Sequence, residues 1–136
     1  MPTNSIRLPY RILKGRLAPL IPLYMFHNGS SVLEYAYVDS GTWFSIFRDT
    51  VANDLGVDIY AGRQTTVTGV GGTPVTVYLH LLGIRIADWH WTAEVGFTTQ
   101  LGLSFNLLGR HTVFDHIEFC FNDRTHELTL APLSSQ

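Results

Sequence analysis

The segment Tyr35–Thr42 constrains the fold more than any other part of the sequence, because a strand-like run ends there in a charged residue. Its first four residues are aromatic or aliphatic, which favours a pleated, half-buried strand. Asp39 follows directly, and a carboxylate at the end of such a strand costs free energy unless hydrogen bonds stabilise it. Ser40 can donate such a bond, and Gly41 lets the backbone turn sharply. Two interpretations are open: a carboxyl group presented from a rigid element, or an ordinary solvent-facing turn.

Length and composition indicate one globular domain. The 136 residues are enough to bury a sizeable core and too few for two ordinary domains. Hydrophobic residues make up 46% of the chain and charged residues 15%, which is typical of a folded protein. Residues 1–16 mix Pro, Asn, Ser and basic residues, so we expect an N-terminal arm that is extended or mobile. Residues 17–136 then form a single domain.

Charge and cysteine content exclude several classes of partner and site. The net charge of -2 provides no basic surface for nucleic acid, so no nucleic-acid partner is expected. The longest apolar run, residues 17–26, is short and contains two prolines, so we expect no membrane span. Cys120 is the only cysteine, which excludes an intramolecular disulfide and fits a reducing compartment. Basic residues near the N-terminus interrupt any signal-like apolar region, and we therefore predict a cytoplasmic protein.

Periodicity predicts mostly β-structure. Residues 20–26 and 32–38 read as two strands joined by an Asn-Gly turn, a strong hairpin signal. A second hairpin spans residues 64–80 and has a glycine-rich tip, and further strands are expected over 84–87, 91–97, 117–121 and from 128. Residues 57–60 are a candidate short strand.

Two helical segments interrupt this pattern. Phe47, Val51 and Leu55 repeat every four residues and predict a main helix within 44–55, with Gly56 as its C-terminal cap. Residues 111–115 are expected to form a short second helix near the C-terminus. The expected fold class is therefore mostly β with one main helix and a short C-terminal helix.

Other common catalytic constellations are absent from the sequence. The six histidines show no zinc-ligand spacing, and a single cysteine cannot build a zinc knuckle. Cys120 is interpreted as a packing residue. There is no Gly-x-Ser-x-Gly elbow, and no Lys-Ser/Thr pair or helix follows the glycines of residues 69–72. We therefore expect no metal and no cofactor.

Four motifs, in order along the chain, resemble those of retropepsin-like aspartic proteases. Tyr37–Gly41 is similar to the apolar-Asp-Thr/Ser-Gly signature, and Ala52–Gly56 to the Ala-x-x-Leu-Gly pattern of cellular members. Val67–Val77 resembles the flap, and Leu107–Arg110 the apolar-apolar-Gly motif that crosses under the active site. The resemblance covers roughly residues 17–131. It implies a closed, β-barrel-like half of an acid protease.

The resemblance also implies a catalytic arrangement. Aspartic proteases use two carboxyl groups around one water, and this chain contains only one Asp-Ser/Thr-Gly motif. Asp88, Asp115 and Asp123 are each followed by other residues, so an active site requires a homodimer that acts on a peptide or protein substrate. The implied residues are catalytic Asp39; supporting Ser40, Gly41, Thr42, Leu108 and Gly109; and, for the flap and substrate, Val70, Gly71, Gly72 and Trp43.

One departure from the family pattern keeps a second interpretation open. Retroviral members carry an Asp two residues after the signature glycine, where it pairs with the Arg that follows the second glycine motif. This position is Trp43 here, so Arg110 loses that partner; Glu34 or a residue of another subunit would have to replace it. The alternative function is a non-proteolytic dimerisation or peptide-binding module with the same fold.

Overall fold

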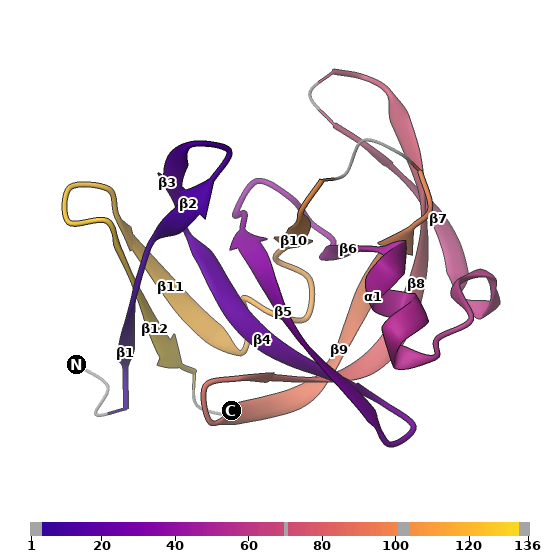
Figure 1. Ribbon diagram of the computed structural model, residues 1–136, viewed down its shortest axis with the longest axis horizontal. Helices are drawn as coiled ribbons and strands as arrows, with labels where there is room; N and C mark the ends of the chain where they lie inside the picture. Colours follow the sequence, from indigo (N-terminus) through magenta and orange to yellow (C-terminus); the bar gives the residue numbers. More distant parts are fainter. Residues whose placement is uncertain (1–3, 70, 101–103, 134–136) are drawn as a thin grey trace.

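The chain is described by a computed structural model that covers residues 4–69, 71–100 and 104–133. Strands dominate these residues, with one α-helix and one short 3-10 helix (Figure 1). The elements are β1 (Ile6–Pro9), β2 (Arg11–Leu13), β3 (Arg16–Ala18), β4 (Leu20–His27), β5 (Ser30–Val38), β6 (Ile46–Arg48), α1 (Asp49–Leu55), η1 (Ile59–Ala61), β7 (Arg63–Thr68), β8 (Pro74–Ile86), β9 (Trp89–Thr98), β10 (Asn106–Leu108), β11 (Ile117–Asn122) and β12 (Glu127–Pro132).

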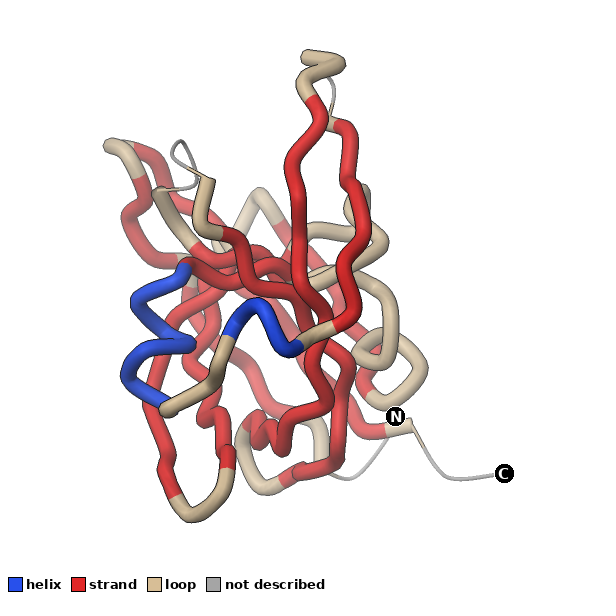
Figure 2. Tube along the Cα trace, turned by 90° about the vertical axis from the view of Figure 1, so that its right-hand side faces the viewer, coloured by secondary structure: helices blue, strands red, loops and turns tan. Residues whose placement is uncertain are grey.

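The main sheet closes on itself. Its strand order is β4-β5-β10-β6-β9-β8-β7, and an additional pairing of β4 with β8 joins six of these strands into a ring. Strand β7 lies outside the ring and forms a long hairpin with β8, which stands away from the body of the molecule (Figure 2). The expected fold class, mostly β with one main helix, is confirmed.

The β4–β5 hairpin shows how local sequence builds this ring. Asn28 and Gly29 form its turn with φ angles of 45° and 84°, which Asn and Gly tolerate best. Alternation then points Leu23 and Met25 of β4 inward, at 1% and 0% exposure, while Tyr24 faces outward. The hairpin therefore contributes one apolar face to the core and delivers the end of β5 at the opposite end from the turn.

The main helix is shorter than predicted because sheet pairing takes its first residues. Residues 46–48 form β6, in which Ile46 pairs with Gly96 of β9 and with Leu107 of β10. Phe47 is fully buried against Phe97 in that sheet and does not lie on a helix. The helix ends as predicted at Gly56, whose φ of 72° is left-handed.

Two other predicted elements are wrong. Residues 57–60 are not a strand, because Ile59–Ala61 form the 3-10 helix η1. The short helix expected over 111–115 is a series of turns. Thr112 has a φ of 58°, and its hydroxyl bonds the backbone of Glu94, so the segment cannot continue as a regular helix.

The N-terminal segment takes part in a second sheet. Strand β1 pairs with β12, which pairs with β11, and the backbone N–H of Tyr10 donates to the carbonyl of His126. Strands β2 and β3 then form a small hairpin beside the end of β5 (Figure 1). The division into a 1–16 arm and a 17–136 domain remains a prediction.

A tightly packed glycine in the ring yields a stability prediction. A Cβ added to Gly96 would overlap Cγ1 of Val77 and lie 3.3 Å from the carbonyl oxygen of Ser45. We expect Gly96→Ala to lower the free energy of unfolding by about 1–3 kcal/mol, measured by urea titration. Gly69→Ala is the control, because nothing lies within 4 Å of its Cβ position. Equal stability of the two variants would contradict the packing described for β6, β8 and β9.

Candidate active site

Asp39 stands at the end of two parallel strands. Strand β10 pairs in parallel with β5, with Leu108 opposite Val38. The backbone N–H of Asp39 donates to the carbonyl of Leu108 at 3.0 Å, which continues the pairing by one residue. The position of Asp39 is therefore set by backbone hydrogen bonds of the closed sheet.

The loop after β5 orients the Asp39 carboxylate. The backbone N–H of Gly41 donates to Oδ1 of Asp39 at 2.8 Å, and the N–H of Thr42 approaches the Asp39 carbonyl at 3.4 Å. A Cβ at position 41 would lie 3.2 Å from that Oδ1, so glycine gives the carboxylate its room. One carboxylate oxygen is thus bound within the loop, and the other remains available to accept a hydrogen bond.

The segment after β10 packs directly against this loop. Gly109 is buried, and a Cβ there would lie 2.6 Å from the carbonyl oxygen of Phe44. Its N–H donates to Oγ of the fully buried Ser45 at 2.9 Å, and the N–H of Arg110 donates to the Thr42 carbonyl at 3.1 Å. Only glycine permits this close approach of two backbones.

Most of the residues selected from the sequence therefore come together. Asp39, Gly41, Thr42, Leu108 and Gly109 share one hydrogen-bonded unit, and Ser40 lies exposed within it.

The glycines of the β7–β8 hairpin do not join this unit. Gly71 and Gly72 lie at the exposed tip of the hairpin, where the N–H of Gly72 donates to the Gly69 carbonyl at 2.9 Å. The tip extends away from the ring (Figure 2). Val70, also selected from the sequence, lies outside the described residues.

Trp43 stands at the position of the retroviral Asp and makes an aromatic contact instead of an ion pair. Its side chain is 56% exposed, and its ring lies 5.2 Å from that of His111, centroid to centroid. The N–H of His111 donates to the Trp43 carbonyl at 2.7 Å. Arg110 is exposed and forms no ion pair among the described residues. Glu34 forms no ion pair with Arg110 within the described residues, and its Oε2 accepts a hydrogen bond from Asn106.

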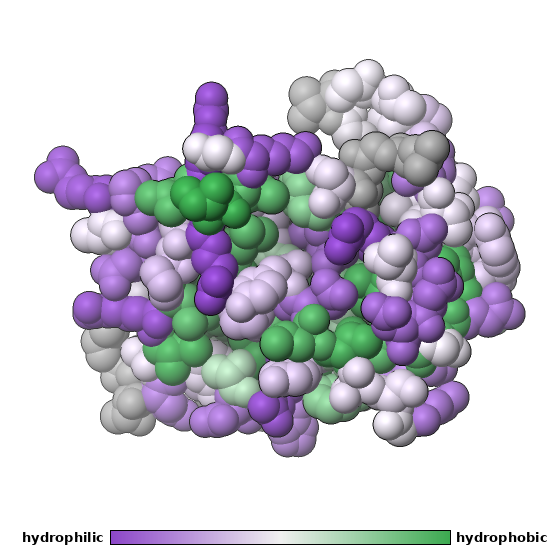
Figure 3. All heavy atoms as spheres, in the orientation of Figure 1, coloured by the Kyte–Doolittle hydropathy of each residue, from purple (hydrophilic) through white to green (hydrophobic). Residues whose placement is uncertain are grey.

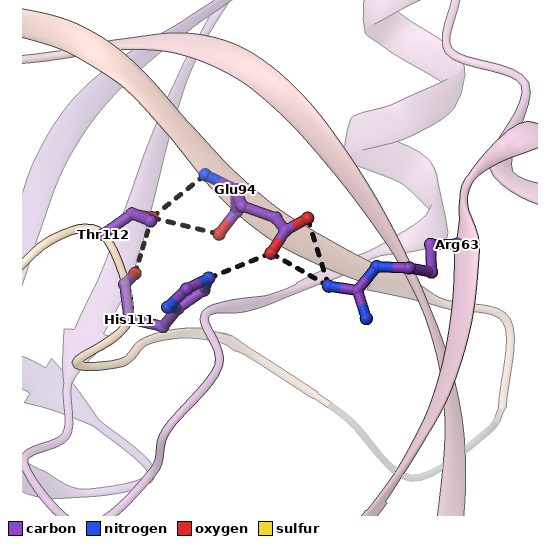
Figure 4. A network of polar contacts seen from close by, with 4 residues as sticks. All are labelled: Arg63, Glu94, His111 and Thr112. Atoms are coloured by element: carbon purple, nitrogen blue, oxygen red, sulfur yellow. Dashed lines mark hydrogen bonds and ion pairs between the residues drawn. The ribbon is translucent and has the colours of Figure 1, made fainter.

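His111 belongs to a polar network that sequence reasoning missed. Its Nε2 lies 2.9 Å from Oε1 of Glu94 on β9, and Glu94 also pairs with Arg63 at the start of β7 (Figure 4). Thr112 adds hydrogen bonds to both backbone groups of Glu94. The network connects the loop that carries Trp43 to the base of the β7–β8 hairpin.

The network changes the protonation of Glu94. Burial acts to raise the pKa of Glu94, but hydrogen bonds from His111 and Arg63, together with their charges, outweigh burial and lower that pKa below 4.5. The ionised form of Glu94 is therefore favoured in the folded protein.

Asn106 is a second residue that sequence reasoning missed. It is 2% exposed, accepts a hydrogen bond from the N–H of Arg48, and donates to the Tyr35 carbonyl. It thereby links β6 to β5 across β10. Neither of the two segments it joins is near it in the sequence, so no local signal identifies it.

Solved structures have a similar fold. A retropepsin-like aspartic protease from Rickettsia conorii matches with a TM-score of 0.66 over 93% of this chain and 98% of that chain, at 18% identity. The chain has a retropepsin-like fold. The EIAV protease complexed with the inhibitor HBY-793 matches with a TM-score of 0.55, over 74% of this chain and 88% of that chain, also at 18% identity. The sequence matches no family model and no curated protein.

A shared fold does not by itself determine an activity. Among the described residues, no three or more His, Cys, Asp or Glu side chains are grouped to hold a metal ion. No helix in the same part of the chain is long and apolar enough to cross a membrane.

The depressed pKa of Glu94 predicts a pH dependence of stability. A carboxyl group whose pKa is lower in the folded state stabilises fully above its unfolded value, here 4.5, and loses that contribution as the pH falls through the folded value. On acidification below pH 4.5, we expect the free energy of unfolding to fall less for Glu94→Gln than for the unmodified protein. Urea titrations from neutral pH to well below pH 4.5 measure this difference. The exposed Glu118→Gln is the control. An identical pH profile for Glu94→Gln and the unmodified protein would contradict the network.

Proposed function

We propose that the protein is an aspartic endopeptidase that is active as a homodimer. The observation that carries this proposal is the Asp39 carboxylate, held by the Gly41 N–H at the end of β5, in a loop against whose later residues Gly109 packs. The retropepsin-like fold supports the same reading. The chain offers one such carboxylate, and the proposed chemistry needs two, so a second copy supplies the other.

The proposed mechanism uses the pair as one unit. Two carboxyl groups a few ångströms apart cannot both ionise easily, so they share a proton. The ionised Asp39 takes a proton from water while the water oxygen adds to the scissile carbonyl, and the protonated Asp39 of the second copy gives its proton to the carbonyl oxygen. In the tetrahedral intermediate the C–N bond then breaks, the amine nitrogen takes the proton that the first Asp39 received from water, and a hydroxyl proton of the intermediate returns to the second carboxylate as the new carboxyl group forms.

Other residues take supporting roles in this proposal. Ser40 is exposed beside Asp39 and would brace the loop of the second copy. The β7–β8 hairpin would act as a flap, with Gly71 and Gly72 over a bound peptide, so that closure excludes water. The peptide would bind in an extended form and add backbone hydrogen bonds as an extra strand does.

Trp43 supports the alternative function. Its ring is 56% exposed beside the Asp39 loop, where relatives of the retroviral type carry an acidic residue. Exposed aromatic rings are favoured in binding surfaces. A peptide-binding or dimerisation module without proteolysis would use the same fold.

The cytoplasmic location also stays a proposal, consistent with the single exposed thiol of Cys120.

The catalytic role of Asp39 predicts the loss of cleavage in one variant. Asp39→Asn keeps the size of the side chain but cannot share the proton, so cleavage of an unfolded protein substrate should fall by about 10³-fold or more. Product peptides are measured by mass spectrometry from acidic to neutral pH. Asp88→Asn, which removes an exposed carboxylate in the β8–β9 turn, should keep full activity. Equal cleavage by Asp39→Asn and the unmodified protein would rule out the mechanism.

The proposed dimer predicts a mass in solution. Sedimentation equilibrium should show a species of twice the 15.3 kDa chain whose fraction rises with protein concentration. The Asp39→Asn protein should still form the dimer, because the substitution removes a charge from the active site and leaves the backbone contacts between the two copies unchanged. A strict monomer at high concentration, together with cleavage that requires Asp39, would show that the second carboxyl group comes from elsewhere.

A further inference from the structure

A cavity of about 570 Å³ opens beside Asp39 and Ser40. Three parts of the chain that are distant in sequence build its walls: the β3–β4 segment, the end of β5, and the β11–β12 turn with the neighbouring Tyr10. The β2–β3 hairpin and the β11–β12 turn lie on the same side of the molecule as the end of β5 (Figure 1). None of the motifs that carry the family resemblance includes the β11–β12 turn.

Apolar side chains form part of the walls of this cavity, between polar ones. Leu17 and Phe121 line it with 45% and 41% of their surface exposed, and the buried residues Ala18 and Val38 also line it. Hydrophobic side chains gather over the β2–β3 hairpin, with hydrophilic ones around them (Figure 3). Large apolar side chains left open to water around a cavity indicate a binding surface.

The cavity also contains a carboxylate that is held in place. Oδ1 of Asp123 accepts a hydrogen bond from the hydroxyl of Tyr10 at 2.8 Å, and Tyr10 is only 8% exposed. The backbone of Tyr10 is fixed in turn by its hydrogen bond to His126. Burial first, and then the hydrogen bond to Asp123, raise the pKa of Tyr10 to about 12, so its hydroxyl keeps the proton that it donates.

Asp123 keeps the capacity to bind a cation. A carboxylate accepts several hydrogen bonds, and Tyr10 uses one of its oxygens. No ion pair joins Asp123 to a basic side chain within the described residues, although Arg124 is its neighbour in sequence. Covering this carboxylate with an apolar group would cost desolvation free energy without compensation.

We propose that this cavity is the subsite for a lysine or arginine side chain of the substrate, close to the bond on which Asp39 acts. The aliphatic stem of that side chain packs between Leu17 and Phe121, and its charged end reaches Asp123. Long basic side chains bury their stems along apolar surface in this way and keep the charge at a polar end. The inference rests on the proposed function for the course of the peptide past Asp39.

The test measures binding without cleavage. Short extended peptides of neutral residues, labelled with a fluorophore, carry either lysine or norleucine at one position that is moved along the peptide. Norleucine keeps the stem and lacks the charge. Binding to the Asp39→Asn protein is followed by fluorescence anisotropy. At one position lysine should bind about threefold to tenfold more tightly than norleucine, and the difference should shrink as salt is added.

Two further variants assign the preference to Asp123. Adding Asp123→Asn should remove it, whereas adding Asp88→Asn, also an exposed carboxylate in a hairpin turn, should leave it intact. Adding Asp123→Lys should create a preference for glutamate over glutamine at the same position, which a merely unfolded variant could not show. A lysine preference that survives both changes at position 123 would overturn the proposal, as would the absence of peptide binding.

Cleavage by the unmodified protein separates this inference from the proposed function. A lysine preference in binding, without any cleavage by the unmodified protein, would support the subsite and contradict proteolysis. Cleavage that depends on Asp39 but ignores a basic residue at every position would support proteolysis and overturn the subsite.

Discussion

The parallel pairing of β10 with β5 is the contact on which the candidate site depends. It ends in the hydrogen bond from the N–H of Asp39 to the Leu108 carbonyl and is followed by the close approach of Gly109 to Phe44. Two segments distant in the chain, 36–39 and 106–108, are held together here by backbone atoms. Because backbone groups inside a closed sheet have few alternative partners, the carboxylate at this end has a defined position.

Around this pairing, polar side chains connect the loops to the sheet. Ser45 and Asn106 are both buried, and each bonds backbone groups of a neighbouring segment. The His111–Glu94–Arg63 network links the Trp43 loop to the hairpin base from the other side. No Asp–Arg pair of the retroviral type is present among the described residues. The ring contact between Trp43 and His111, and the hydrogen bond of His111 to the partly buried Glu94, hold the loop that carries Trp43.

Local signals predicted the parts of the fold that local chemistry determines. Asn28-Gly29 specified the β4–β5 turn, and Gly56 specified the helix end, since both depend on left-handed backbone angles. The predicted start of the main helix was wrong, because residues 46–48 pair as β6 with two strands that are distant in sequence. The residues of the signature were selected by their motif, and the structure places Asp39, Gly41 and Thr42 together. Asp123 was set aside because its neighbours in sequence do not match that motif, and only the folded chain brings it to the cavity that Asp39 also lines.

The second sheet has a consequence for how a dimer would control activity. Strands β1, β12 and β11 pair within one chain, so the described fold needs no strand from a partner to complete this sheet. We therefore expect folding and association to be separate equilibria. In the proposed dimer, the amount of assembled site varies with the square of the free chain concentration, so the abundance of the protein itself acts as the switch.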